Sequence, residues 1–320
     1  MNTETKLLWH SKSKSWFEKV TLETPKVGWV KVKSLCSFIS QGTERLVIAE
    51  DLTSEIAKAM AVPYLKGSLG KEFTYGYSLI GEIVEGENHL LGKKVHIMHP
   101  HQDIFNAKIE DLSEIPGDMS PEIASLASNM ETAINAIWDA EIELGDRVLI
   151  MGYGVIGALI AEILQSSVGV EVRVIEKNEN RAKIAKDRGL EVLGEIRHDF
   201  DAIFNTTSSE TMLQQALEWT SSEGKVLELS WYGSKTIQLH LGADFHYGRK
   251  KIISSQVSHI PGRKQPRWSY TKRKQLVFKL LSRLNFDHLT QNKILFQDSA
   301  VFYDQLRKGK ENSLSTVIIY

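Results

Sequence analysis

The chain has very little cysteine and almost no net charge, and both features exclude classes of protein. Among 320 residues there is one cysteine, Cys36, so an internal disulfide and any zinc site built from several cysteines are excluded. A single thiol also fits a reducing compartment. The formal net charge of −1 provides no overall field that would attract nucleic acid or an anionic membrane. We therefore expect neither as a partner.

The sequence also lacks a hydrophobic run that reads as a membrane segment. The first sixteen residues contain no apolar core of the length that a signal peptide needs. The most apolar stretch, residues 148–164, contains three glycines and Glu162. A strand, a turn and a helix explain this stretch better than a membrane span does. We expect a cytoplasmic protein with an ordinary buried core.

Hydrophobic periodicity changes along the chain, which predicts two domains. The first part alternates apolar and polar residues, as half-buried strands do, at 28–33, 75–85 and 93–98. Residues 121–141 have apolar positions at helical spacing. After Gly145 the chain alternates strands at 147–152, 171–176, 201–206, 225–230 and 251–257 with helices at 155–166, 179–188 and 210–221. This alternation predicts a parallel sheet covered by helices on both faces. A helix near 272–284, another at 301–308 and a strand at 315–320 are expected to follow.

The chemistry of the chain is indicated by a glycine motif, GxGxxG, directly after the first strand of the alternating region. Gly152 permits a tight turn, Gly154 lets the backbone approach a pyrophosphate, and Gly157 allows a helix to pack closely on the strand. The helix that starts at Val155 and Ile156 offers backbone N–H groups and the positive end of its dipole to phosphates. The motif predicts dinucleotide binding.

An acidic residue at the end of the next strand specifies the dinucleotide. Glu176 follows Gly157 by nineteen residues, where a carboxylate accepts hydrogen bonds from the ribose hydroxyls and repels a 2′-phosphate. This favours NAD. The nearby cations Lys177 and Arg181 leave NADP possible, because they would bind a 2′-phosphate. Thr206 ends the strand expected at 201–206, where loops that line the cofactor begin.

The order of these parts resembles the medium-chain dehydrogenase/reductase superfamily, which includes alcohol dehydrogenases and quinone reductases. The matching segments are GYSLIGEIVE at 76–85, LGKKV at 91–95, ETAINAIWDAEIELGD at 131–146 and the glycine motif. The resemblance implies an α/β fold with two domains. A β-rich GroES-like catalytic domain would cover 1–124 and 263–320, and a Rossmann dinucleotide-binding domain with a doubly wound parallel sheet would cover 125–262.

A closer likeness links the chain to zinc-type alcohol dehydrogenase-like proteins, including bacteriochlorophyllide dehydrogenases. The segments that carry this likeness are ISQGTER at 39–45, YGYS at 75–78, HPHQ at 99–102, NMETA at 129–133 and SQV at 255–257. Zinc members of the superfamily have a cysteine where this chain has Ser40 and a histidine where it has Tyr77. Residues 127–129 offer no thiolate or imidazole as the third ligand. Because a catalytic zinc needs three protein ligands, we expect no metal site and a zinc-lacking subgroup.

Without zinc, a side chain must donate or accept the proton of the reacting oxygen or stabilise its charge. His99 is the first candidate, because the resemblance places it after the strand that lines the substrate cleft and because histidine titrates near neutral pH. Tyr77 is the second, with Ser40 and Thr43 as further hydroxyl candidates. Two alternatives remain for His99. It is an ordinary loop histidine satisfied by hydrogen bonds, or it binds a metal ion together with His101 and Asp103.

Other polar residues are candidates for the cofactor and the substrate. The resemblance places Thr132 at the start of a helix near the nicotinamide. Substrate contacts are predicted for His101 and Asn129, and for His246 and Arg249, since an arginine binds an anionic group through two hydrogen bonds. A solvated loop is the alternative for the last two.

The basic and aromatic segment 262–274 resembles nucleic-acid binding sequences. A flap over an acidic ligand, or a plain surface, fits a neutral chain better.

The sequence thus predicts a zinc-independent NAD(P)-dependent oxidoreductase that exchanges a hydride with a carbonyl, an alcohol or an activated double bond of a small-molecule substrate. An NADPH-dependent quinone or enone reductase is one alternative, and a non-catalytic dinucleotide-binding protein is another. The run at 252–257 is a plausible edge strand, and relatives pair such strands across two subunits, so we expect a homodimer.

Overall fold

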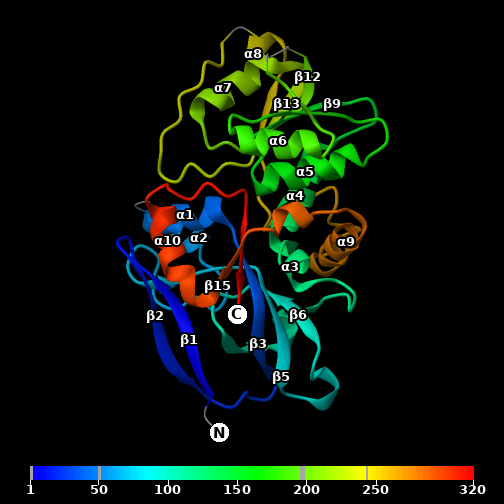
Figure 1. Cartoon of the computed structure of the whole chain (residues 1–320). Helices are drawn as coiled ribbons and strands as arrows, with labels where there is room; N and C mark the ends of the chain where they lie inside the picture. The colour runs from blue at the N-terminus through cyan, green and yellow to red at the C-terminus, as the bar shows by residue number, and fades with distance from the viewer. Residues whose placement is uncertain (1–2, 50–51, 195–198, 243) are drawn as a thin grey trace. The chain divides into compact units, whose positions relative to one another are not determined.

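The computed structural model describes residues 3–49, 52–194, 199–242 and 244–320. Two compact units are distinguished (Figure 1). Unit 1 comprises residues 1–128 and 281–320, and unit 2 comprises residues 129–280. Within the described parts of the chain, no helix is long and apolar enough to cross a membrane.

Unit 2 is built from strands that alternate with helices. Its elements are α4 (Ala127–Ala140), which begins two residues before the unit boundary, β9 (Arg147–Met151), α5 (Val155–Gln165), β10 (Glu171–Ile175), α6 (Glu179–Asp187), β11 (Glu191–Val192), β12 (Phe200–Asn205), α7 (Glu210–Trp219), β13 (Thr220–Glu228), α8 (Asp244–Tyr247), β14 (Lys251–Ser254) and α9 (Tyr270–Arg283). The described strands form a six-stranded sheet in the order β11-β10-β9-β12-β13-β14. Each neighbouring pair is parallel.

The strand order reverses at β9, which determines how the helices cover this sheet. From β9 the chain moves through α5 to β10 in one direction along the sheet, whereas β12, α7 and β13 continue in the other direction. Because crossovers between parallel strands are right-handed, α5 and α7 cover opposite faces. The predicted doubly wound parallel sheet is confirmed. The core strand β9 is a continuous apolar run in which residues 148–151 are fully buried, as is typical of a strand covered on both faces.

Local sequence signals explain where several helices begin. The side chain of Asn178 accepts a hydrogen bond from the Arg181 N–H at the start of α6, and Ser209 caps α7 in the same way. Such caps satisfy N–H groups that have no partner inside the helix. The long helix expected at 121–141 is divided into α3 (Pro121–Ala124) and α4. The predicted helices at 155–166, 179–188 and 210–221 are confirmed.

Unit 1 is rich in strands. Its elements are β1 (Thr3–His10), β2 (Ser15–Leu22), β3 (Trp29–Ile39), α1 (Gln41–Ala49), α2 (Ser54–Ala59), β4 (Phe73–Thr74), β5 (Leu79–Glu85), η1 (Asn88–Leu90), β6 (Lys94–Ile97), β7 (Ile104–Lys108), η2 (Ile109–Asp111), β8 (Ser113–Glu114), α3, η3 (Asp287–Leu289), β15 (Lys293–Leu295), η4 (Phe296–Asp298), α10 (Ser299–Arg307) and β16 (Thr316–Ile319). Its described strands form a seven-stranded sheet centred on β3 and a three-stranded sheet β2-β1-β4. The β-rich domain predicted for the N-terminal part is confirmed.

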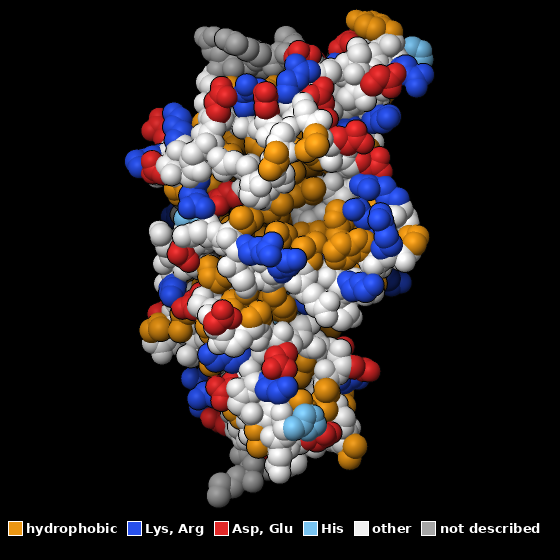
Figure 2. Space-filling view, turned by 90° about the vertical axis from the view of Figure 1, so that its right-hand side faces the viewer, with side chains coloured by type: hydrophobic (Ala, Val, Ile, Leu, Met, Phe, Trp, Pro, Cys, Tyr) orange, Lys and Arg blue, Asp and Glu red, His pale blue; other side chains and the backbone are white. Residues whose placement is uncertain are grey.

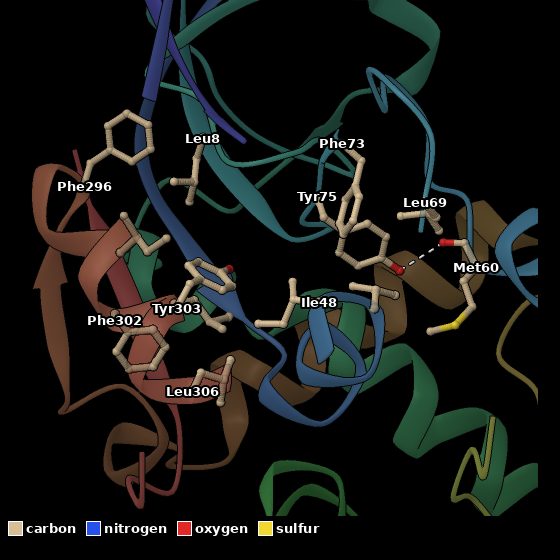
Figure 3. Packing of buried hydrophobic residues seen from close by; sticks show 13 residues of the cluster. Leu8, Ile48, Met60, Leu69, Phe73, Tyr75, Phe296, Phe302, Tyr303 and Leu306 are labelled. Atoms are coloured by element: carbon tan, nitrogen blue, oxygen red, sulfur yellow. Dashed lines mark hydrogen bonds between the residues drawn. The ribbon is translucent and has the colours of Figure 1, made fainter. Parts of the chain in front are cut away.

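The two ends of the chain meet in the hydrophobic core of unit 1. Figure 3 shows Leu8, Ile48 and Tyr75 from the N-terminal part packed with Phe302 and Tyr303 of α10. The Tyr75 hydroxyl donates a hydrogen bond of 3.0 Å to the Met60 carbonyl oxygen. Strand β16 joins the same unit by pairing antiparallel with β3. The C-terminal segment is therefore an integral part of the N-terminal fold.

The boundary after unit 2 lies at residue 280, later than the one expected at 262, because the basic segment packs on α4. Arg273 forms an ion pair of 3.3 Å with Glu131, and Lys274 forms one of 2.5 Å with the same carboxylate. The ring centroids of Trp138 and Trp268 lie 4.8 Å apart. These contacts give part of segment 262–274 a structural role within unit 2.

Candidate functional site

The glycine motif forms the turn that links β9 to α5 in unit 2. Gly152 has a φ of +92°, and a Cβ atom at this position would lie 2.8 Å from the Thr206 Oγ1 atom. The Thr206 hydroxyl shares its one hydrogen between the carbonyl oxygens of Met151 (2.9 Å) and Gly152 (3.1 Å). Thr206, at the end of the neighbouring strand β12, therefore stabilises the turn. The sequence predicted a contact with the cofactor for this residue, and the structure gives it a structural role in the site.

The other two glycines have different surroundings. A Cβ atom on Gly157 would lie 2.0 Å from the Gly152 carbonyl oxygen, so the helix packs on the turn as closely as a backbone allows. A Cβ atom on Gly154 would meet no described atom within 4 Å. The first hydrogen bond within α5 runs from the Ala158 N–H to the Gly154 carbonyl oxygen. The N–H groups of Val155 and Ile156 precede it, so they are available to an anion at the start of the helix.

Glu176 lies at the carboxyl end of β10 and contacts the glycine turn. Its Oε2 atom accepts a hydrogen bond of 2.7 Å from the Tyr153 N–H, and its Oε1 atom accepts one of 2.7 Å from the Asn178 N–H. Each carboxylate oxygen has a second lone pair for a further donor. Lys177 is exposed and Arg181 is half-buried at the start of α6. The structure thus brings Glu176 to the turn, as the sequence predicted.

The predicted substrate residues of unit 2 do not gather at this turn. His246 and Arg249 precede β14 and therefore lie at the amino edge of the parallel sheet, whereas the glycine turn follows the carboxyl end of β9. Arg249 is exposed and pairs with Glu223. Because ligands of such sheets bind beyond the carboxyl ends of the strands, a substrate role for His246 and Arg249 does not fit their position. Thr132 and Asn129 both lie on α4.

Three of the predicted catalytic residues come together in unit 1. The side chains of Ser40 and Thr43, at the start of α1, lie beside the Tyr77 hydroxyl and act on its pKa as hydrogen-bond donors. We call Tyr77, Ser40 and Thr43 the hydroxyl cluster. Burial raises the pKa of Tyr77 to about 12, and the nearby Glu44 carboxylate contributes to the rise, while the two hydroxyls lower it. The Tyr77 phenol therefore keeps its proton at neutral pH and is able to donate a hydrogen bond.

A buried carboxylate lies beside the hydroxyl cluster, and sequence analysis did not identify it. Glu44 is 1% exposed. Its Oε1 atom accepts a hydrogen bond of 2.8 Å from the Ser40 N–H, and its Oε2 atom accepts hydrogen bonds from His101 Nε2 (3.2 Å) and from the Tyr303 hydroxyl. The spacing of Ser40 and Glu44, close to that of a capping box, was the one sequence signal for this contact.

His101 is buried within unit 1, although the sequence suggested a substrate contact. Its side chain is fully buried, and the Nδ1 atom lies 2.7 Å from the Ser37 Oγ atom. The Ser37 Oγ atom is in turn 2.9 Å from the Tyr320 hydroxyl. Both ring nitrogens of His101 are therefore engaged with protein groups, which leaves neither for a substrate.

The surroundings of His99 argue against the acid–base role predicted for it. Its ring stacks on Phe105 with a centroid distance of 3.7 Å, and Nδ1 donates a hydrogen bond of 2.8 Å to the Pro100 carbonyl oxygen. Burial lowers the pKa of His99 to about 3. A histidine with this pKa does not exchange protons near neutrality, which argues against His99 as the acid–base group.

The residues at the positions where the resemblance expects zinc ligands do not offer the ligand types that zinc prefers. Ser40 and Tyr77 present neighbouring hydroxyls, and the Ser128 hydroxyl donates a hydrogen bond of 2.7 Å to the Tyr77 carbonyl oxygen. Zinc prefers thiolate, imidazole and carboxylate ligands. The single thiol, Cys36, is buried, and burial raises its pKa. In the described part of the chain, no group of three His, Cys, Asp or Glu side chains is arranged to bind a metal ion.

Comparisons with known proteins identify the enzyme class. Residues 148–216 match the TrkA-N domain family. The chain is 24% identical over 257 residues to D-guloside 3-dehydrogenase from Shigella flexneri, covering 73% of each protein. The predicted class, an NAD(P)-dependent dehydrogenase or reductase, is confirmed.

Solved structures share the fold over nearly the whole chain. A protein from Clostridium scindens described as a zinc-binding dehydrogenase has a TM-score of 0.79 at 14% identity, covering 99% of each chain. A short chain alcohol dehydrogenase from E. coli CFT073, complexed with NADH, has a TM-score of 0.77 at 14% identity, covering 99% of this chain and 100% of its own. These relatives confirm the alcohol dehydrogenase-like fold. They do not bear on the likeness to bacteriochlorophyllide dehydrogenases, which stays a prediction.

Proposed function

We propose that the protein is an NAD(H)-preferring dehydrogenase that works without zinc on a secondary alcohol of a polyhydroxylated small molecule, or on the corresponding ketone. The observation that carries the proposal is the glycine turn, where the space before Gly154 is open and Glu176 lies at the end of the neighbouring strand. The substrate class is suggested by D-guloside 3-dehydrogenase, whose name describes oxidation of a sugar derivative.

In this proposal the start of α5 binds the pyrophosphate of the cofactor. The N–H groups of Val155 and Ile156 and the positive end of the helix dipole attract the two phosphates. Glu176 accepts hydrogen bonds from the ribose hydroxyls and disfavours a 2′-phosphate. The cofactor, when bound, supplies or accepts the hydride at its nicotinamide ring.

The hydroxyl cluster binds the reacting oxygen of the substrate. In the direction of reduction, the Tyr77 phenol donates its hydrogen bond, and then its proton, to the oxygen that becomes negative as the carbonyl carbon is reduced. The pKa of about 12 for Tyr77 keeps the phenol in its donor form at neutral pH. Ser40 and Thr43 stabilise the negative charge left on the phenol oxygen, because hydrogen bonds to an ionised group favour it.

Cofactor binding is tested by titrating the protein with NADH and NADPH and following tryptophan fluorescence. We expect NADH to bind at least about tenfold more tightly, equivalent to about 1.4 kcal/mol. Glu176→Gln removes the negative charge but keeps an amide oxygen as acceptor, and it should reduce this preference. Equal or tighter binding of NADPH to the unmodified protein would refute the proposed cofactor.

The reaction is tested with a panel of polyols, sugar glycosides and their ketones, with NAD⁺ or NADH. With any substrate found, Tyr77→Phe should lower kcat by roughly a hundredfold while the Kd for NADH changes little. Tyr75→Phe is the matched control, because it removes a neighbouring phenol that bonds only to the Met60 carbonyl oxygen among the described residues. Equal losses in both variants would mean that the Tyr77 hydroxyl has no special role.

One observation favours a second candidate, an NADPH-dependent quinone or enone reductase. Lys177 follows Glu176 directly and is exposed, so its ammonium group is placed to bind a 2′-phosphate on the cofactor ribose. A preference for NADPH that is lost in Lys177→Ala, with turnover of quinones or enones, would establish this alternative. Tight cofactor binding without turnover across both panels would instead indicate a non-catalytic dinucleotide-binding protein.

A further inference from the structure

We propose that Glu44 is a positioning residue, whose carboxylate holds the two segments that carry the hydroxyl cluster at a set separation through His101. The inference rests on the proposed function of that cluster. It assigns a role to a buried group that does not touch the substrate.

Glu44 holds the first of these segments, the start of α1. Its Oε1 atom accepts the Ser40 N–H at 2.8 Å, and its own N–H donates to the Ser40 carbonyl oxygen at 2.8 Å. Both bonds are made to the backbone of Ser40. They therefore determine where the Ser40 hydroxyl lies, and with it the first turn of α1, which carries Thr43.

His101 holds the second segment, residues 75–77. Its N–H donates a hydrogen bond of 3.0 Å to the Tyr75 carbonyl oxygen. Its ring occupies the space beside Gly76, where a Cβ atom would lie 2.9 Å from the imidazole Cδ2 and Nε2 atoms. Gly76 also has a φ of +128°, a backbone conformation that residues other than glycine rarely adopt. The backbone directly before Tyr77 is thus packed against the imidazole.

The bond between Glu44 and His101 joins the two segments. The Glu44 carboxylate is an acceptor, so the imidazole Nε2 atom carries the hydrogen of their 3.2 Å bond. The Tyr303 hydroxyl of α10 supplies a further donor to the same carboxylate oxygen. Because a buried charge without donors is strongly unfavourable, the carboxylate requires these partners, and their arrangement determines the separation of Tyr77 from Ser40 and Thr43.

The far side of the imidazole is also held. The Ser37 Oγ atom on β3 lies 2.7 Å from His101 Nδ1, and the Tyr320 hydroxyl is 2.9 Å from the same Oγ atom. With Nε2 donating to Glu44, the ring has one orientation in which both bonds form. The network therefore draws on β3, α1, α10 and the last residue of the chain to fix one ring.

The test compares Glu44→Gln with a matched control, Glu85→Gln. Glu85 forms an ion pair with Lys31 within unit 1, and the Lys31 side chain is 6% exposed. The control therefore also removes the carboxylate partner of a buried polar group. It lies at the other end of β5, about 20 Å along the strand from the segment that carries Tyr77. Tyrosines labelled with ¹³C at Cζ report on the phenol, and the signal of Tyr77 among the nine tyrosines is identified by its loss in Tyr77→Phe.

We expect Glu44→Gln to move the Tyr77 signal and to lower kcat by roughly ten- to a hundredfold on a substrate from the panel, as misplacement of a reacting group does. The Kd for NADH should stay within about twofold of the parent value, since a positioning role in unit 1 predicts no loss of cofactor affinity. Glu85→Gln should lower the melting temperature without moving the Tyr77 signal. A Tyr77 signal and a kcat unchanged in a folded Glu44→Gln variant would overturn the proposal.

Tyr303→Phe provides a second variant in case Glu44→Gln does not fold. It removes one donor to the carboxylate and keeps the ring in the core, and it should move the Tyr77 signal in the same direction by a smaller amount. An unchanged signal in this variant would count against the proposal. The signal is measured without substrate or cofactor, so failure of the positioning role is distinguishable from failure of the proposed dehydrogenase activity.

Discussion

Substitutions at Gly154 and Gly157 should have different effects: the first should reduce cofactor binding, and the second should reduce the free energy of unfolding. In Gly154→Val, the new side chain enters a space where no described atom lies within 4 Å of the Cβ position, and Gly154 has an ordinary φ of −79°. The free energy of unfolding should change by no more than about 1 kcal/mol, because the loss at this N-cap position and the gain from a stiffer unfolded chain oppose each other.

The same substitution should abolish tight dinucleotide binding. The valine methyl groups would occupy the space through which a pyrophosphate reaches the N–H groups of Val155 and Ile156. Loss of two hydrogen bonds to a charged group, at about 1.5 kcal/mol each, amounts to about 3 kcal/mol, more than a hundredfold in Kd. Fluorescence titration with NADH measures the Kd, and thermal unfolding measures the stability.

Gly157→Ala is the contrasting change. Its Cβ atom would lie 2.0 Å from the Gly152 carbonyl oxygen, where ordinary contacts begin at 3.4 Å, so the helix or the turn must move by more than 1 Å. Such overpacking costs about 1–3 kcal/mol, offset by up to about 1 kcal/mol of helix propensity, and the melting temperature should fall by several degrees. If Gly154→Val bound NADH as the parent does, the assignment of the turn to the pyrophosphate would be refuted.

Three other predictions concern pH, metal content and assembly. Because burial lowers the pKa of His99 to about 3, the unfolded state takes up a proton below its pKa of about 6.5 that the folded state does not. The contribution of His99 to the free energy of unfolding is complete above pH 6.5. It decreases as the pH is lowered, by about 2 kcal/mol at pH 5. His99→Phe should reduce the acid sensitivity seen in urea unfolding, and an unchanged slope would contradict the assigned burial. Elemental analysis should find well under one zinc per chain, whereas stoichiometric zinc that survives dialysis would refute the assignment of Ser40 and Tyr77. Strand β14 is at the edge of its sheet with Ile252 37% exposed, so light scattering should detect a dimer, and a monomer at micromolar concentration would contradict this.

The fold of unit 2 was largely predictable because its signals are local. An apolar run such as 147–151, a glycine turn and an amphipathic helix each report their own structure within a few residues. The surroundings of the three glycines follow from the same short segment. Gly152 and Gly157 closely approach Thr206 or the turn itself, and the Cβ position of Gly154 faces open space. Glu176 was predictable for the same reason, because the length of one βαβ unit places it beside the turn.

Unit 1 was less predictable because several of its elements carry no local signal in the sequence. The hairpin of β1 and β2 is joined by Ser11–Lys14, a segment without glycine, proline or asparagine. The sequence therefore contains no turn signal that would predict this hairpin. The broken helix at 121–140 was also missed, since its apolar spacing continues through the interruption at Ser125 and Leu126.

By itself, the sequence determined the glycine turn, the acid beside it and the hydroxyl residues at the positions where the resemblance expects zinc ligands. Only the tertiary structure decided which polar residues work together. His99 and His101 are two residues apart, yet one stacks on Phe105 and the other bonds to Glu44. Glu44 itself meets Tyr303 across 259 positions of the chain. Contacts of this kind depend on the closure of the whole β-rich unit, in which strand pairing and burial bring remote residues together, and no local pattern records them.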